Sequence, residues 1–404
     1  MKTDRAVHWG LGIGAVMIVA AMLWQSYAPA DRHRNPYPEM TKKWEFTTDG
    51  SVTGALALAS DGTLYAAGTD GFVYALAPEG NLKWKLRTGP MQASPVIGTD
   101  GTIYVTDEQE RIFAINPNGT QQWMTGGGPY ATQNLGKLAA AIDNNFLYTP
   151  WRGEVHGIRL SNGDGDTIFG TYFDLGSSIV ILPNGLVAHL GRGRLQAAGS
   201  DGRDAWQYPE LTQQAIEKNN GFPPPGNFWL DSAMAVGADG TIYAAMGDGN
   251  LIAIGADGAL KWKFKTKQGW AGNHAAPVIA SDGTIYFSTF EAILYPLSPD
   301  GTLQTKIQIP GSIEVTPVIA EDGTIFVVSG AALFAVAPEG KILARANLDL
   351  SSQSPPTIAP DGTVYVASGA KKIVAFAGGH GGLMDSPWPK FQHDLANTGR
   401  ARPY

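Results

Sequence analysis

The sequence contains no cysteine and few charged residues, and both facts limit what the protein can be. Without cysteine there is no disulfide, no thiolate metal ligand, no cysteine nucleophile and no lipidated cysteine to hold the protein on a membrane. Charged residues make up 16% of the 404 residues, and the formal net charge is -7. Sequence-independent binding to phosphate backbones requires clustered Lys and Arg, so we expect no nucleic-acid partner.

The N-terminus carries a long apolar run. Trp9 to Trp24 is apolar throughout and follows Lys2 and Arg5, which fits both an uncleaved membrane anchor and a cleaved signal peptide. Tryptophan at each end of the run suits the two membrane interfaces and favours the anchor. We expect residues 1–30 to be a signal-anchor or signal peptide and residues 31–41 a linker. The predicted location is the inner membrane, single-pass, with the rest in the periplasm, and secretion after cleavage is the alternative.

One short motif recurs along the chain, most often as Asp-Gly-Thr-Ile-Tyr or a close variant. Its copies begin at Asp61, Asp100, Asn144, Asn184, Asp239, Asp282, Asp322 and Asp361. Successive copies start 39 to 55 residues apart, which is the length of a four-stranded propeller blade. The second unit shows the pattern, with strands expected at 94–98, 102–106, 111–116 and 121–125 and glycine turns between them. The sequence therefore predicts an all-β protein with a single eight-bladed β-propeller over residues 42–377.

The last unit contains only three strands before a glycine-rich tail begins at residue 378. Lys42 to Thr47 looks like an outer blade strand with no blade before it, so we predict that it completes the eighth blade and closes the ring. Residues 378–404 then form a tail with a Trp-Pro and an Asn-Thr-Gly segment. We expect this tail to pack on the propeller through Trp388 and Phe391, and a ligand or partner site is the alternative.

The expected outer strands share a Gly-x-x-x-Trp pattern. It occurs at Gly80/Trp84, Gly119/Trp123, Gly202/Trp206 and Gly258/Trp262. This resembles the tryptophan-docking repeat of the PQQ-like, or quinoprotein-type, β-propeller family, which includes quinoprotein alcohol dehydrogenases and a non-enzymatic outer-membrane assembly propeller. Packing between neighbouring blades explains these tryptophans without any cofactor.

In the enzymes of this family, the resemblance implies PQQ in the central funnel, a calcium ion held by acidic and amide side chains, and an aspartate base. Funnel-facing residues should come from the loops that join the outer strand of one blade to the inner strand of the next. The candidate residues for binding in the funnel or to a partner are Tyr130, Asn134, Asn227, Phe228, Trp229, Trp270, Asn273, His274, Glu314 and Gln353. Calcium requires six to eight oxygens, and Glu314 and Asp231 are the only obvious acids in these loops. We therefore expect no cofactor and no catalysis, with PQQ and calcium as the alternative.

The longest step between motif copies contains an insertion, Asn219–Trp229, in which prolines stiffen the chain and aromatic residues offer contact area. The predicted function is a non-catalytic envelope propeller that acts as a binding or scaffolding platform for a protein or polysaccharide partner. Two alternatives remain. One is a PQQ-dependent dehydrogenase with a divergent funnel site, and the other is a carbohydrate-binding or polysaccharide-processing propeller, because aromatic residues beside amides also suit sugars.

Overall fold

The computed structural model describes residues 36–126, 140–151, 154–169, 178–191, 194–208, 234–245, 250–266 and 275–401. The chain divides into two units, Met1–Pro38 and Glu39–Tyr404, and every described strand belongs to the second unit. Among the described residues there is no helix with the length and apolar character needed to cross a membrane.

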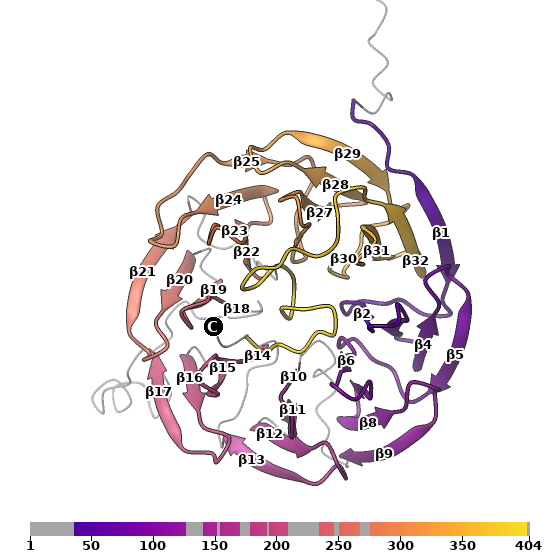
Figure 1. The fold of residues 1–404 in the computed structure, drawn as a ribbon, viewed down its shortest axis with the longest axis vertical. Helices are drawn as coiled ribbons and strands as arrows, with labels where there is room; N and C mark the ends of the chain where they lie inside the picture. The colour runs from indigo at the N-terminus through magenta and orange to yellow at the C-terminus, as the bar shows by residue number, and fades with distance from the viewer. Residues whose placement is uncertain are drawn as a thin grey trace, which may run out of the picture. The chain divides into compact units, whose positions relative to one another are not determined.

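Within these ranges the strands of the second unit form eight four-stranded antiparallel sheets, arranged as blades around a common centre (Figure 1). From the inner to the outer strand, blades 1 to 4 are β2 (Ala57–Leu58), β3 (Leu64–Ala67), β4 (Phe72–Leu76), β5 (Leu82–Arg87); β6 (Val96–Ile97), β7 (Ile103–Thr106), β8 (Arg111–Ile115), β9 (Gln121–Gly126); β10 (Ala141–Ile142), β11 (Phe146–Trp151), β12 (Glu154–Arg159), β13 (Gly165–Phe169); and β14 (Ile179–Ile181), β15 (Val187–Gly191), β16 (Arg194–Ala198), β17 (Asp204–Tyr208). Blades 5 to 8 are β18 (Met234–Val236), β19 (Ile242–Ala245), β20 (Asn250–Ile254), β21 (Leu260–Lys265); β22 (Val278–Ile279), β23 (Ile285–Ser288), β24 (Ile293–Leu297), β25 (Ile307–Gln308); β26 (Val318–Ile319), β27 (Ile325–Ser329), β28 (Ala332–Val336), β29 (Ile342–Asn347); and β30 (Thr357–Ile358), β31 (Thr363–Ser368), β32 (Lys372–Ala377), β1 (Lys42–Thr47). The predicted all-β, eight-bladed propeller is confirmed.

The inner strands are shorter than the sequence pattern predicts. In blade 2 only Val96 and Ile97 pair with β7, whereas the expected strand began at Ser94. Ser94 has another role, because its Oγ accepts a hydrogen bond from Ala55 N in the neighbouring blade (2.8 Å). The contact between blades therefore replaces the ladder pairing that periodicity alone would assign to this residue.

The recurring Asp-Gly motif builds the turn between the first and second strands of a blade. In blade 1, Asp61 Oδ1 accepts a hydrogen bond from Thr63 N (2.9 Å), and Gly62 has a φ of 80°, which favours glycine. Hydrogen bonds to the carboxylate of Asp61 favour its ionised form. The bond from the Thr63 backbone is the main reason that the pKa of Asp61 lies below 3.8. The motif is thus explained by turn chemistry.

Tryptophans of the described outer strands pack across the gaps between neighbouring blades. Trp84 lies over Gly119 of the next blade, where an added Cβ would be 2.8 Å from Trp84 Cδ2, and Trp84 Nε1 donates a hydrogen bond to Pro117 O (2.8 Å). Trp44, Trp123, Trp206 and Trp262 make the same pair of contacts, over Gly80, Gly163, Gly258 and Gly301. In blade 6, Ile307 takes the place of the tryptophan and lies over Gly340. The predicted packing role of the tryptophans is confirmed.

The eighth sheet combines the two ends of the propeller. β1 pairs antiparallel with β32, in a register that runs from Trp44 opposite Ala375 to Thr47 opposite Lys372. Just before β1, Met40 N donates a hydrogen bond to the carbonyl oxygen of Arg345 (2.9 Å), in the outer strand of blade 7. The N-terminal part of this unit therefore contacts two blades that come from its C-terminal part.

Candidate functional site

The ring has two faces that differ in how the chain crosses them. Because neighbouring strands in a blade are antiparallel, the turns after the first and third strands lie on one face. The turns after the second strands and the connections to the next blade lie on the other. We name these the turn face and the loop face. An inner strand therefore begins at the loop face and ends at the turn face.

On the loop face, one register position carries polar side chains in four consecutive blades around the ring. Thr53, Gln92, Glu314 and Gln353 each lie five residues before the last residue of an inner strand. Gln353 is exposed, and the other three are half-buried. Gln92 Nε2 donates a hydrogen bond to Glu108 Oε1 (2.8 Å), which lies on the turn between β7 and β8. Blades 7, 8, 1 and 2 thus present hydroxyl, amide and carboxylate groups at equivalent places.

Of the residues predicted for a site, Glu314 and Gln353 belong to the described part of the chain. The structure brings them to equivalent positions on the adjacent blades 7 and 8. The other predicted residues lie outside the described residues: Tyr130, Asn134, Asn227, Phe228, Trp229, Trp270, Asn273 and His274. The insertion Asn219–Trp229 lies outside them as well. The assignment of all these residues to a binding site stays a prediction.

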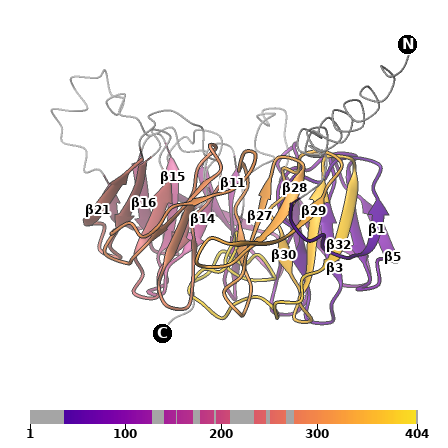
Figure 2. The same cartoon turned by 90° about the horizontal axis from the view of Figure 1, so that it is seen from above.

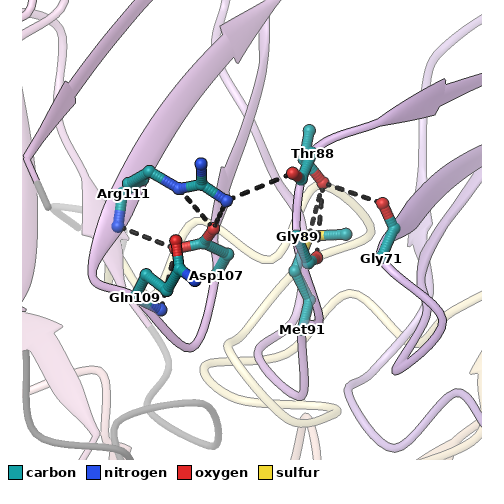
Figure 3. Close-up of polar contacts among 7 residues, drawn as sticks. All are labelled: Gly71, Thr88, Gly89, Met91, Asp107, Gln109 and Arg111. Atoms are coloured by element: carbon teal, nitrogen blue, oxygen red, sulfur yellow. Dashed lines mark hydrogen bonds and ion pairs between the residues drawn. The ribbon is translucent and has the colours of Figure 1, made fainter.

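A partly buried ion pair supports the connection between blades 1 and 2 (Figure 3). Asp107 is fully buried, and its Oδ2 accepts a hydrogen bond from Arg111 Nε (2.7 Å) and lies 2.5 Å from Nη2 of the same guanidinium group. Arg111 Nη2 also donates to Thr88 O (3.2 Å). A Cβ on Gly89 would collide with Asp107 Oδ2, so glycine is required at this point of the loop. The pair therefore connects the turn between β7 and β8 to the connection between blades 1 and 2.

The C-terminal segment Gly382–Ala401, which we name the strap, crosses the centre of the ring on the turn face. It is the yellow trace at the centre of Figure 1, and it follows the lower edge of the ring in Figure 2. The backbone amides that end six inner strands donate hydrogen bonds of 2.7 to 2.9 Å to strap carbonyl groups: Leu58 to Leu395, Ile97 to Ala396, Ile142 to Thr398, Ile181 to Gly399, Ile279 to Trp388 and Ile319 to Pro389. The strap therefore connects blades 1, 2, 3, 4, 6 and 7 through the same register position.

The strap also has a compact polar centre. Lys390 is fully buried, and its Nζ donates hydrogen bonds to Phe391 O (2.9 Å), Asp394 O (2.9 Å) and Asn397 Oδ1 (2.5 Å). Three acceptors match the three donors of an ammonium group. Burial nevertheless lowers the pKa of Lys390 from 10.5 to about 7, while the nearby Asp394 carboxylate acts in the opposite direction. Asn397 Nδ2 in turn donates to Pro95 O in blade 2 (3.0 Å).

The predicted packing of the tail on the propeller is confirmed for this segment. Trp388 is fully buried within the core cluster that also contains Ile279, and Phe391 is half-buried. The roles of Lys390 and Asn397 could not be read from the sequence. The Trp-Pro and Asn-Thr-Gly pairs drew attention to the segment, but they carry no indication of which main-chain groups they meet.

The resemblance to quinoprotein enzymes implies acidic and amide side chains around a calcium ion. Among the described residues, no group of three or more His, Asp or Glu side chains is arranged to hold a metal ion. Glu314 Oε1 accepts a hydrogen bond from Ser312 (3.4 Å). The expectation that no cofactor binds stays a prediction.

Comparison with known proteins agrees with this geometry. A family model described as outer membrane protein assembly factor BamB matches residues 22–166 and 191–304, which is more than half of the chain. The chain belongs to the BamB family of PQQ-like β-propellers. The propeller repeat, the docking tryptophans and the blade count thus have a common explanation in this family.

Solved structures similar to this BamB-family chain include BamB from Moraxella catarrhalis, with a TM-score of 0.64 and 16% identity, covering 83% of this chain and 97% of that one. Virginiamycin B lyase from Staphylococcus aureus has a TM-score of 0.52 and 13% identity, covering 83% of this chain and 98% of that one. At these identities the similarity shows the fold alone, and the two proteins have different functions. No curated protein matches the chain in sequence.

Proposed function

We propose that this BamB-family propeller is a non-catalytic platform in the bacterial envelope that binds a protein partner through its loop face. Membership in a family described as an assembly factor is the observation that carries the proposal. The arrangement of the ring supports it, because the strap covers the centre of the turn face and the loop face carries polar positions in consecutive blades.

In this proposal, Gln353, Glu314 and Gln92 belong to the contact surface, together with the insertion Asn219–Trp229. Aromatic residues dominate the energetics of protein interfaces, so Phe228 and Trp229 are the proposed anchors. The half-buried amide and carboxylate groups would supply the polar rim of the interface.

We further propose that residues 9–28 tether the propeller to the inner membrane, and that the pairing of β1 with β32 closes the ring and stabilises it. The apolar run from Trp9 to Trp24 supports the tether. The ladder from Trp44 to Thr47 supports the closing role of β1, because it covers the edge of β32, which would otherwise be open. We also propose that the protein works without PQQ or calcium, because calcium requires six to eight oxygens and Glu314 and Asp231 are the only obvious acids in the predicted funnel loops.

The test is site-specific photo-crosslinking in the full chain in living cells. A crosslinking residue at Gln353 should capture a protein partner, whereas one at the exposed Asp300, on the turn between the third and fourth strands of blade 6, should not. Deletion of Asn219–Trp229 should reduce the capture at Gln353 and leave the melting temperature unchanged. Equal capture at Gln353 and Asp300, or capture that survives the deletion undiminished, would contradict the proposal.

A further inference from the structure

We propose that the turn-face mouth of the ring is a peptide-recognition site, and that the strap is its resident ligand, which can be replaced by the same segment from a second copy of the chain. The idea starts from how the strap is bound. Its principal contacts with the ring are main-chain hydrogen bonds to the last amides of six inner strands. As in peptides that pair with sheet edges, such bonds give affinity through the main chain, so specificity must come from a few side chains.

The side-chain anchors lie at both ends of the strap. Trp388 is fully buried, and its ring centre is 5.2 Å from that of His393. Two residues before it, Ser386 Oγ donates a hydrogen bond to Ile279 O (2.7 Å). Near the other end, the fully buried Asn397 donates to Pro95 O. A peptide without these groups would keep the main-chain bonds but lose the contacts that fix its register.

The strap also maintains its own shape between these anchors. Lys390 Nζ donates hydrogen bonds to three oxygens of the strap. Asp394 accepts hydrogen bonds from Thr398 N (3.0 Å) and Thr398 Oγ1 (2.6 Å). These bonds are internal, so a detached strap can form them before it meets the ring. Preorganisation of this kind lowers the entropic cost of binding.

Strained and unpaired groups limit how tightly the strap is held. Gln392, His393 and Asn397 have φ values of 57°, 71° and 57°, in the left-handed region that disfavours ordinary side chains. Among the described residues, Trp388 Nε1 and Gln392 Oε1 are buried without a hydrogen-bond partner. The net affinity of the strap is therefore smaller than its contacts alone imply, which is what exchange requires.

The connection to blade 8 allows a direct experiment on the full chain. Gly379 is exposed, and no atom of the described residues lies within 4 Å of a Cβ added to it. A protease recognition sequence inserted after Gly379 would let the strap be cut free from the folded protein. A fluorescent synthetic peptide of residues 380–404 is then added, and exchange is followed by anisotropy and gel filtration.

We expect the cut strap to stay bound to the ring until the labelled peptide is added. The labelled peptide should then replace it, with one peptide bound per ring. A peptide with Asn397→Gly tolerates the positive φ but loses both side-chain bonds, and it should bind about tenfold more weakly, which equals about 1.4 kcal/mol. The matched control is Arg400→Gln, which removes only an exposed hydrogen bond to Asn144 Oδ1 and should bind within about twofold of the original peptide.

Three results would overturn the proposal. The first is a cut ring that takes up no labelled peptide. The second is a ring that loses its far-ultraviolet circular dichroism on cutting, because the strap would then be an inseparable part of the folded core. The third is equal binding of the Asn397→Gly and Arg400→Gln peptides, which would leave the site without sequence specificity.

Discussion

Replacing Trp84 by alanine tests how much a docking tryptophan contributes to the ring. A packed tryptophan buries about 150 to 250 Å², and Trp84 is half-buried, so about 100 Å² of apolar contact would be lost. At about 25 cal/mol per Å² this amounts to about 2.5 kcal/mol. Loss of the hydrogen bond to Pro117 O adds about 0.5 kcal/mol. We therefore expect Trp84→Ala to lower the free energy of unfolding by about 3 kcal/mol.

The effect on thermal unfolding follows from the size of the cooperative unit. The unit Glu39–Tyr404 would unfold with an entropy of about 2.1 cal/mol/K per residue, so a loss of about 3 kcal/mol lowers the Tm by about 4 °C. Far-ultraviolet circular dichroism is the appropriate probe, because the substitution itself changes tryptophan fluorescence. Leu82→Ala is the matched control, since Leu82 lies in the same strand and is 43% exposed.

The glycine under the indole ring of Trp84 provides a second test. Gly119 has a φ of 88°, and a Cβ there would meet Trp84, so Gly119→Ala should destabilise both by strain and by collision. Only the collision disappears when Trp84→Ala is combined with it, so the two changes should not be additive. If Trp84→Ala costs no more than Leu82→Ala, or if the double variant is simply additive, the docking argument is wrong.

Three other predictions concern closure, pH and cofactor. A chain that begins at Asp49 lacks β1 and should melt well below one that begins at Asn35; identical melting curves would mean that the ring closes without this strand. The backbone amide two residues after Asp61 lowers the pKa of its carboxyl group below 3.8, so the stability it contributes is present above that pH and lost as the pH falls through the folded-state pKa. Asp61→Asn should therefore make the free energy of unfolding depend less on pH in the acid range. If that pH dependence is the same with and without the substitution, the prediction is wrong. Titration with PQQ, with and without calcium, should produce neither saturable fluorescence quenching nor turnover in a dye-linked oxidation assay, whereas both together would identify a quinoprotein dehydrogenase.

Much of the propeller could be predicted from the sequence because each blade is a local unit. The turn at Asp61 and Gly62 is built by residues within a few positions of one another, so its repetition reveals the blades and their number. The spacing of Trp84 within its strand likewise indicated a repeated packing role. The repeat did not show that each tryptophan lies on a glycine of the next blade, because that contact joins residues of different repeats.

The candidate site was less predictable, because it too depends on contacts between residues of different repeats. The sequence identified Glu314 and Gln353 as loop residues, but their equivalence followed only from the ends of the inner strands. The ion pair of Asp107 with Arg111 was not anticipated, because nothing in a charged turn shows that one carboxylate will be fully buried.

The sequence by itself determined the fold class, the number of blades and the chemistry of their turns, because these depend on residues close together in the chain. Only the tertiary structure decided that the strap crosses the centre of the ring. Its carbonyl groups bond to the amides of Leu58, Ile97 and four other inner-strand residues, which are spread between positions 58 and 319 of the chain. Main-chain groups are the same in every residue, so no side-chain pattern encodes this pairing. It arises only when the blades have brought those amides into one ring.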